Sequence, residues 1–200
     1  MEWSSRPEPL TAPVNPDPRG ELYRILMSHR CGLPNDDTLA RMLATQAVGG
    51  GTLPMGLGLE SADFDTLLAR HFPGASRPII PPRPAPRWDS RLVEELGELI
   101  NLLQLYRAGR DESERWLSVI VATGCMSNDH LWEDLGLWSR RDLSELMQRN
   151  FPTLAAKNDH DMKWKKFLYK QLCIQEGVYL CRAPSCAVCC DYSQCFGPEE

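Results

Sequence analysis

The chain has 200 residues, 42% hydrophobic and 24% charged, which suits one packed core or two small cores sharing an interface. A formal net charge of −5 and a pI near 5.4 argue against general nucleic-acid binding, which needs a basic surface. No stretch approaches the roughly 20 apolar residues of a membrane span, and the polar start lacks the features of a secretory signal. We therefore expect a cytoplasmic protein that binds neither nucleic acid nor a membrane.

Proline-rich segments divide the sequence into parts. Residues 1–18 combine prolines with few apolar side chains, so we expect a flexible arm that cannot bury enough surface to fold. A second run of prolines at 73–88 predicts an extended connector. Between and after them lie a predicted N-terminal helical unit at 19–72, a C-terminal helical unit at 89–177, and a cysteine-rich segment at 178–200.

Apolar residues in the first unit recur every three or four positions, which predicts three helices. Asn35 or Asp36 can cap the second of these helices, and the third follows Ser61. The side chains expected to face inward are Leu22, Ile25 and Leu26, then Leu39, Met42 and Leu43, and finally Phe64, Leu67 and Leu68.

The same periodicity continues in the second unit. Asp89 or Ser90 can cap a long helix, Ser139 can cap another, and Asp159 or His160 would begin the last one, before Gly177. The predicted inward stripes are Val93, Leu96, Leu99, Ile100 and Leu103, then Trp116, Val119 and Ile120, then Leu143, Leu146 and Met147, and finally Met162, Trp164, Phe167 and Leu168. No segment alternates like a strand, so we expect an all-α fold.

The two units resemble each other. Residues 39–61 align with residues 117–139 at a constant offset of 78. After one inserted residue, Leu67, Arg70, Phe72 and Pro73 align with Leu146, Arg149, Phe151 and Pro152. This pattern predicts a duplicated helical unit, with chance similarity between leucine-rich helices as the alternative.

The cysteines are the chief chemical signal. Eight cysteines in a chain without an export signal favour metal binding over disulfides, because reducing compartments keep thiols free. Four of them, Cys181, Cys186, Cys189 and Cys195, form a C-x4-C-x2-C-x5-C pattern, with Cys190 as an additional thiol. The spacings of the first three cysteines, C-x4-C-x2-C, coincide with those of plant-type ferredoxins, but structural zinc also takes four cysteines. Spacing alone does not decide between an iron-sulfur cluster and zinc.

Two weaker ligand candidates lie upstream. Cys125 and His130 lie in the segment 124–130, which corresponds to the glycine-rich segment 46–52 of the first unit, and either could complete a metal shell. A purely local structural role is the alternative for both. Cys173, on the last predicted helix, is expected to be a buried core thiol.

The cysteine segment and two stretches before it resemble the NifQ family of nitrogenase proteins. Cys-Arg-Ala-Pro-Ser-Cys-x-x-Cys at 181–189, with Cys-Phe-Gly at 195–197, is similar to the C-terminal signature of that family. Met-Lys-Trp-Lys-Lys-Phe at 162–167 and His-Leu-Trp-Glu-Asp-Leu-Gly-Leu at 130–137 also resemble family segments. The similarity covers roughly residues 90–197.

The resemblance implies a carrier of a molybdenum-containing iron-sulfur cluster that donates molybdenum to the iron-molybdenum cofactor of nitrogenase. It also implies the scaffold NifEN and the reductase NifH as partners. The implied cluster ligands are Cys181, Cys186, Cys189 and Cys195, with Cys190, Cys125 and His130 as further candidates. Two alternatives remain on chemistry alone: a zinc-stabilised helical interaction module, and an iron-sulfur electron carrier that keeps its metal.

Lysines gather on the last predicted helix. Lys163, Lys166 and Lys170 share one helical face, with Lys165 nearby, and could attract molybdate or an acidic partner. A solvated helix face is the alternative. No nucleophile elbow, phosphate loop or zinc-protease motif is present, so we do not expect an enzyme.

Overall fold

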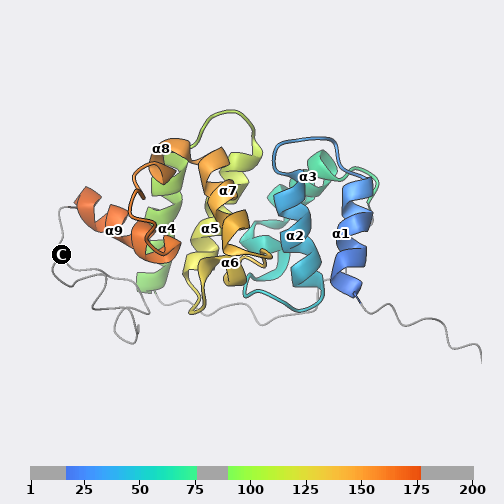
Figure 1. Ribbon diagram of the computed structural model, residues 1–200, viewed down its shortest axis with the longest axis horizontal. Coiled ribbons are helices and arrows are strands. Elements are labelled where there is room, and N and C mark those ends of the chain that lie inside the picture. The colour runs from blue at the N-terminus through green and yellow to red at the C-terminus, as the bar shows by residue number, and fades with distance from the viewer. Residues whose placement is uncertain (1–16, 76–89, 177–200) are drawn as a thin grey trace, which may run out of the picture.

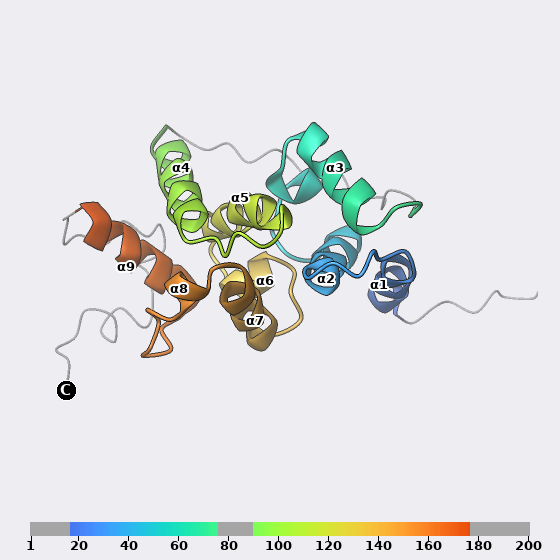
Figure 2. The same cartoon turned by 90° about the horizontal axis from the view of Figure 1, so that it is seen from above.

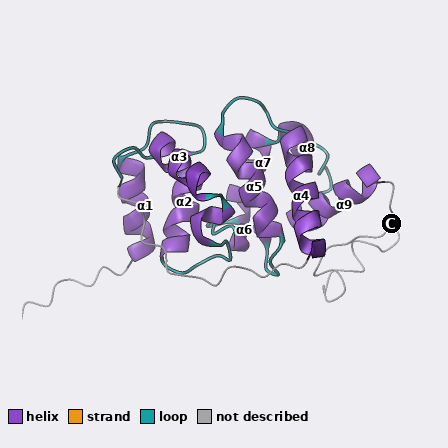
Figure 3. Cartoon of the chain, turned by 180° about the vertical axis from the view of Figure 1, so that it is seen from behind, coloured by secondary structure: helices purple, strands orange, loops and turns teal. Residues whose placement is uncertain are grey.

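The computed structural model describes residues 17–75 and 90–176. Within these ranges it contains helices and loops and no strand, which confirms the predicted all-α class (Figure 3). No helix in these two ranges is long and apolar enough to cross a membrane. The cysteine-rich segment, and almost all of the predicted arm and connector, lie outside the described residues.

The helices stand in a row, with α1 at one end and α9 at the other (Figure 1). Seen from above, α1 to α3 occupy one side of the molecule and α4 to α7 the other (Figure 2). The elements are α1 (Pro18–Ser28), α2 (Asp36–Ala47), the 3-10 turn η1 (Met55–Gly58), α3 (Ser61–His71), α4 (Ser90–Leu105), α5 (Ser113–Cys125), α6 (Leu131–Asp134), α7 (Arg140–Asn150), α8 (Pro152–Ala155) and α9 (Trp164–Glu176).

Most predicted inward residues are buried, and they form one continuous core across both units. Leu39, Leu43 and Leu67 are completely buried in the first unit, as are Leu99 and Leu103 in the second. Two predictions were wrong, because Ile25 is 46% exposed and Val93 is 54% exposed. Each lies at the edge of its helical stripe, where burial depends on a neighbouring element and not on periodicity.

Of the predicted helix caps, Ser139 is confirmed and Asn35 is not. Ser139 caps α7 as expected, since its side chain accepts a hydrogen bond from the Asp142 backbone N–H at 3.2 Å. Asn35 does precede α2, but its side chain makes no cap. Its Nδ2 instead donates to Ser113 Oγ at 2.8 Å and to Asn150 Oδ1 at 2.7 Å, in the second unit.

The last helix begins four to five residues later than predicted, at Trp164 instead of Asp159 or His160. Asn158 causes this delay, because its Oδ1 accepts a hydrogen bond from the Met162 backbone N–H at 2.9 Å and its Nδ2 donates to Met162 O at 3.0 Å. These bonds close a turn in which Asp161 has a positive φ of 49°. Such a backbone conformation cannot continue a right-handed helix.

The bounds of the elements repeat between the two units. Both α3 and α7 have 11 residues, and the residues that follow them, Phe72 and Phe151, have nearly equal backbone angles, φ −136° and ψ 57° against φ −133° and ψ 53°. In each unit, the last residue of this helix also bonds to the loop before the unit's second helix. His71 O accepts from Cys31 N at 3.1 Å, and Asn150 O accepts from Ala108 N at 2.9 Å.

Contacts between the units are reciprocal. Gly58 and Gly136 both have positive φ, of 84° and 73°. A Cβ atom on Gly58 would lie 2.9 Å from the Thr123 side chain, and one on Gly136 would lie 3.1 Å from the Thr45 side chain. Gly58 and Gly136 are 78 residues apart, as are Thr45 and Thr123. The two units therefore pack about an approximate two-fold axis, in the way that the copies of a symmetric dimer do.

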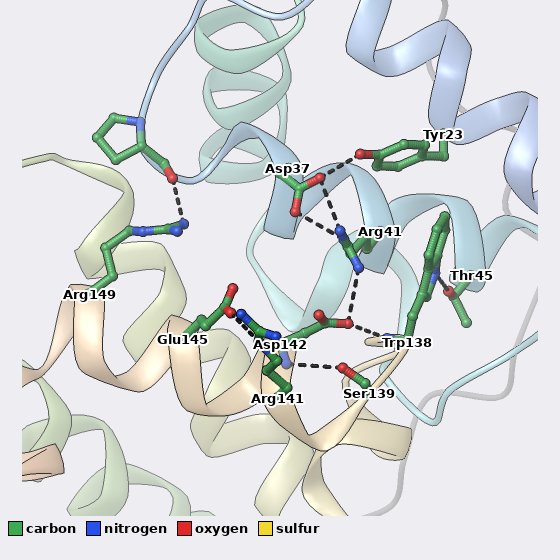
Figure 4. A network of polar contacts seen from close by, with 11 residues as sticks. Tyr23, Asp37, Arg41, Thr45, Trp138, Ser139, Arg141, Asp142, Glu145 and Arg149 are labelled. Carbon is green, nitrogen blue, oxygen red and sulfur yellow. Dashed lines mark hydrogen bonds and ion pairs between the residues drawn. The ribbon is translucent and has the colours of Figure 1, made fainter.

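A polar network lies at the outer edge of this interface (Figure 4). Arg41 of α2 forms ion pairs with Asp37 of its own helix at 2.9 Å and with Asp142 of α7 at 3.1 Å. Its guanidinium also lies 5.0 Å from the ring centre of Trp138, whose other contacts include the Arg19 guanidinium at 4.9 Å. These contacts join α1, α2 and α7 near the surface.

Candidate functional site

The five clustered cysteines, Cys181, Cys186, Cys189, Cys190 and Cys195, lie outside the described residues. The structure does describe α9, the helix that precedes them in the sequence, together with Cys125 at the end of α5 and His130 in the loop that follows it. Between α9 and that loop lies a polar junction that holds three parts of the chain together.

Lys165, in the first turn of α9, is the centre of this junction. Its ammonium donates to Ser127 O at 2.8 Å, to Asp129 O at 2.7 Å and to the carboxylate of Asp134. The three N–H donors of the ammonium thus have three oxygen acceptors. The Lys165 side chain is only 13% exposed and that of Asp134 is fully buried.

Asp134 connects this lysine to the first unit. Its Oδ1 accepts from Thr52 Oγ1 at 2.8 Å, and its backbone carbonyl accepts from Thr52 N at 2.9 Å. The Thr52 hydroxyl also lies 2.8 Å from Ser127 Oγ. Burial raises the pKa of the Asp134 carboxyl, while the Lys165 ammonium and the Thr52 hydroxyl oppose that rise.

Gly51, the residue before Thr52, permits this approach. It has a φ of 65°, and a Cβ atom there would lie 3.0 Å from the backbone carbonyl oxygen of Asp134. A side chain at this position would therefore push the first unit away from Asp134, which explains why the segment needs a glycine.

Cys125 ends α5 beside this junction and is almost completely buried. Burial raises the pKa of its thiol to about 12. A thiol that is almost completely enclosed by the core is not accessible to a metal bound outside it in the present conformation. We therefore leave Cys125 out of the ligand set proposed below.

His130 is exposed and stands at the N-terminal cap of α6. Its backbone N–H donates to the Glu133 side chain at 3.2 Å, so this turn is fixed by local contacts. The imidazole is accessible to a metal bound elsewhere, in contrast to the Cys125 thiol. His130 therefore stays a candidate ligand. Its position at the N-terminus of α6 also fits the alternative, a purely local capping role.

The lysines of α9 divide into two groups. Lys163, just before the helix, and Lys170 are exposed and Lys166 is partly exposed, as expected for a solvent-facing side. Lys165 differs in its burial, since its side chain is 13% exposed and its ammonium pairs with the fully buried Asp134 carboxylate. Cys173 was expected in the core, but it is only partly buried because it lies between the buried Leu172 and the exposed Ile174.

No cluster of three His, Cys, Asp or Glu side chains able to hold a metal lies within the described ranges 17–75 and 90–176. The donor atoms with the right chemistry are the thiols of the cysteine segment. A set of closely spaced thiolates suits iron, zinc and molybdenum-sulfur centres and suits magnesium or calcium poorly.

Fold and sequence together define an all-α protein, built on a repeated helical unit, whose last helix leads into a dense group of thiols. The sequence profile of NifQ matches residues 38–197. The chain belongs to the NifQ family, whose role is in the biosynthesis of the iron-molybdenum cofactor for nitrogen fixation. This membership confirms the family resemblance of the two helical segments and the cysteine segment.

Curated relatives agree over most of their length. The chain is 42% identical to Protein NifQ of Azotobacter vinelandii over 170 residues, which cover 80% of this chain and 87% of the relative. It is 42% identical to Protein NifQ of Rhodobacter capsulatus, with the same coverage, and 35% identical to that of Klebsiella pneumoniae over 82% of this chain and 99% of the relative. No solved structure matches the chain significantly.

Proposed function

We propose that this protein carries a molybdenum-containing iron-sulfur cluster on Cys181, Cys186, Cys189 and Cys195 and donates molybdenum to the maturing nitrogenase cofactor. The observation that supports it best is the coincidence of the four-thiol pattern with the family match, which extends to residue 197 and so includes all four cysteines. Soft thiolate ligands suit both iron and molybdenum-sulfur centres. The role is that of a cytoplasmic carrier and not of an enzyme.

The described helices support a carrier in a second way. The core is continuous across both units, and the junction at Lys165 attaches α9 to this core. A cluster on the segment after α9 would therefore be displayed from a rigid body. The partners we propose are the scaffold NifEN and the reductase NifH, which would receive the molybdenum or assist its insertion.

Metal analysis of the anaerobically purified protein tests the proposal. We expect iron and molybdenum together, with an electron paramagnetic resonance signal from the cluster. Replacing any of Cys181, Cys186, Cys189 or Cys195 by serine should remove most of both metals. Cys31→Ser is the matched control, because Cys31 is exposed and lies far from the segment in sequence, and it should retain both metals.

The alternatives give different results in the same experiment. Zinc without iron or molybdenum would establish the zinc-stabilised interaction module. An iron-sulfur cluster that remains bound through repeated oxidation and reduction, and that loses no molybdenum to NifEN, would establish an electron carrier. Loss of molybdenum from the protein with equal gain by NifEN would support the donor.

A further inference from the structure

The junction at Lys165 joins three segments that are distant in sequence. It contains the first turn of α9, the loop at 127–130 between α5 and α6, and Thr52 of the glycine-rich loop in the first unit. A buried lysine whose three donors reach three different residues restrains the helix that bears it in more than one direction, unlike a single surface ion pair.

The position of Lys165 makes this restraint important for whatever follows α9. Lys165 lies one residue after the helix begins, and the described part of the helix ends at Glu176. At 1.5 Å per residue, the end of α9 lies about 17 Å from Lys165, so a rotation of about 10° at Lys165 moves that end by about 3 Å. In the sequence, the cysteine segment starts two residues after Glu176.

We propose that Lys165 is a positioning residue that fixes the direction of α9, and with it the placement of the metal-bearing segment, for molybdenum delivery. This inference rests on the proposed donor function. We assign Lys165 no ligand role. It acts through the orientation of α9 and through the two loop carbonyls, Ser127 O and Asp129 O, that its ammonium holds together.

The contrast with the other lysines of α9 supports this assignment. Lys170 lies five residues further along the same helix and is exposed. Lys165 is the one whose side chain is buried against a fully buried carboxylate. Removing the charge of Lys170 alters only the solvated surface, whereas removing that of Lys165 releases the loop at 127–130 from α9.

The test uses the double variant Lys165→Met/Asp134→Leu, which removes both buried charges together and so leaves neither unpaired. We expect a thermal midpoint close to that of the native protein and an unchanged load of iron and molybdenum, since the cysteines are untouched. The backbone amides of 126–130 and of the first turns of α9 should exchange with deuterium about ten-fold faster. The fraction of loaded molybdenum delivered to NifEN in a fixed time should fall about five-fold.

Lys170→Met is the control and should match the native protein in exchange and in delivery. Native exchange and native delivery in the double variant would overturn the proposal. If the double variant does not fold, Thr52→Val replaces it, because it removes only the hydroxyl that lies between Ser127 and Asp134. It should change both measurements in the same direction by a smaller amount, and unchanged values would again overturn the positioning role.

The two proposals fail in different ways. A native protein without molybdenum contradicts the donor function, and the exchange measurement then still decides whether Lys165 orients α9. A double variant that delivers molybdenum as well as the native protein does contradicts the positioning role and leaves the donor function standing.

Discussion

Asn35 donates a hydrogen bond from its Nδ2 to Ser113 Oγ at 2.8 Å, and these two residues occupy equivalent places in the two helical units, 78 residues apart. Both are completely buried. A contact between equivalent residues can occur only on the axis that relates the two copies. Asn35 therefore marks the centre of the interface between the units.

The first prediction concerns this buried amide. Asn35→Leu should lower the free energy of unfolding by about 2–3 kcal/mol, because it leaves polar groups of Ser113 and Asn150 buried without the Asn35 amide. Urea denaturation followed by circular dichroism measures the loss. Asn101→Leu is the control, since Asn101 is exposed on α4 and its replacement should change stability by less than about 0.5 kcal/mol. Equal stability of the two variants would contradict the central role of Asn35.

The second prediction concerns the reciprocal glycines. Gly58→Ala and Gly136→Ala should each destabilise the protein by about 1–3 kcal/mol, since each introduces a Cβ atom at a positive φ and against a threonine of the other unit. Thermal unfolding of both variants measures the effect. Gly97→Ala serves as the control, because a Cβ atom there meets nothing within 4 Å and alanine favours the helix by about 0.5–1 kcal/mol. The control should therefore be more stable than the native protein.

The third prediction concerns Lys165 as a single substitution. Lys165→Met should destabilise the protein by about 3–5 kcal/mol, because it leaves the buried Asp134 carboxylate without its cation. Adding Asp134→Leu should restore most of this stability. Chemical denaturation of the single and the double variants at pH 7 measures both steps. A single variant as stable as the native protein would show that Asp134 finds another cation or a proton.

The fourth prediction concerns acid stability through Asp111. Burial opposes ionisation of this carboxyl, but hydrogen bonds from Ser113 and Arg70 outweigh burial and lower its pKa to about 2. Because the folded pKa is below the unfolded value of 3.8, the ionised group stabilises the fold above pH 4, and this contribution is lost as the pH falls from about 4 to about 2. Asp111→Asn should flatten the fall of stability with pH in that window. An unchanged slope in acid denaturation would contradict the assignment.

The fifth prediction separates Cys125 from the clustered cysteines. Cys125→Ala should retain the iron and molybdenum of the native protein, because the Cys125 thiol is buried and has a pKa raised to about 12. It should lower the unfolding free energy by about 1 kcal/mol through the small cavity that it creates. Metal analysis and denaturation of the same sample measure both effects. Loss of metal without loss of stability would restore Cys125 to the ligand set.

Periodicity alone predicted most of the fold. Helical spacing identified the core positions of α2 and α3, such as Leu39 and Leu67, because burial on a helix follows its 3.6-residue repeat. Periodicity did not predict the role of a side chain that forms hydrogen bonds to a distant element. Asn35 is a residue type that often caps helices, and it stands directly before α2. Its amide bonds instead to Ser113 and Asn150, because the second unit packs against it.

The candidate site was also predicted from the sequence only in part. The spacing of the clustered cysteines could be seen in the sequence, and the family match agrees with the segment that contains them. The junction at Lys165 was missed because lysines are usually exposed. A signal was present, however, since Leu168, Tyr169 and Leu172 lie three, four and seven residues after Lys165 and share its face of α9. A lysine on the buried face of a helix predicts a buried acid, and Asp134 is that acid.

The reciprocal packing of Gly58 on Thr123 and of Gly136 on Thr45 has an evolutionary consequence. A half-length ancestor with one such glycine and one such threonine would pair with a copy of itself through two identical contacts. Gene duplication and fusion would then free each half to change independently. The loop of the second half, at 127–130, holds α9 through the carbonyls of Ser127 and Asp129, and α9 has no counterpart in the described part of the first half.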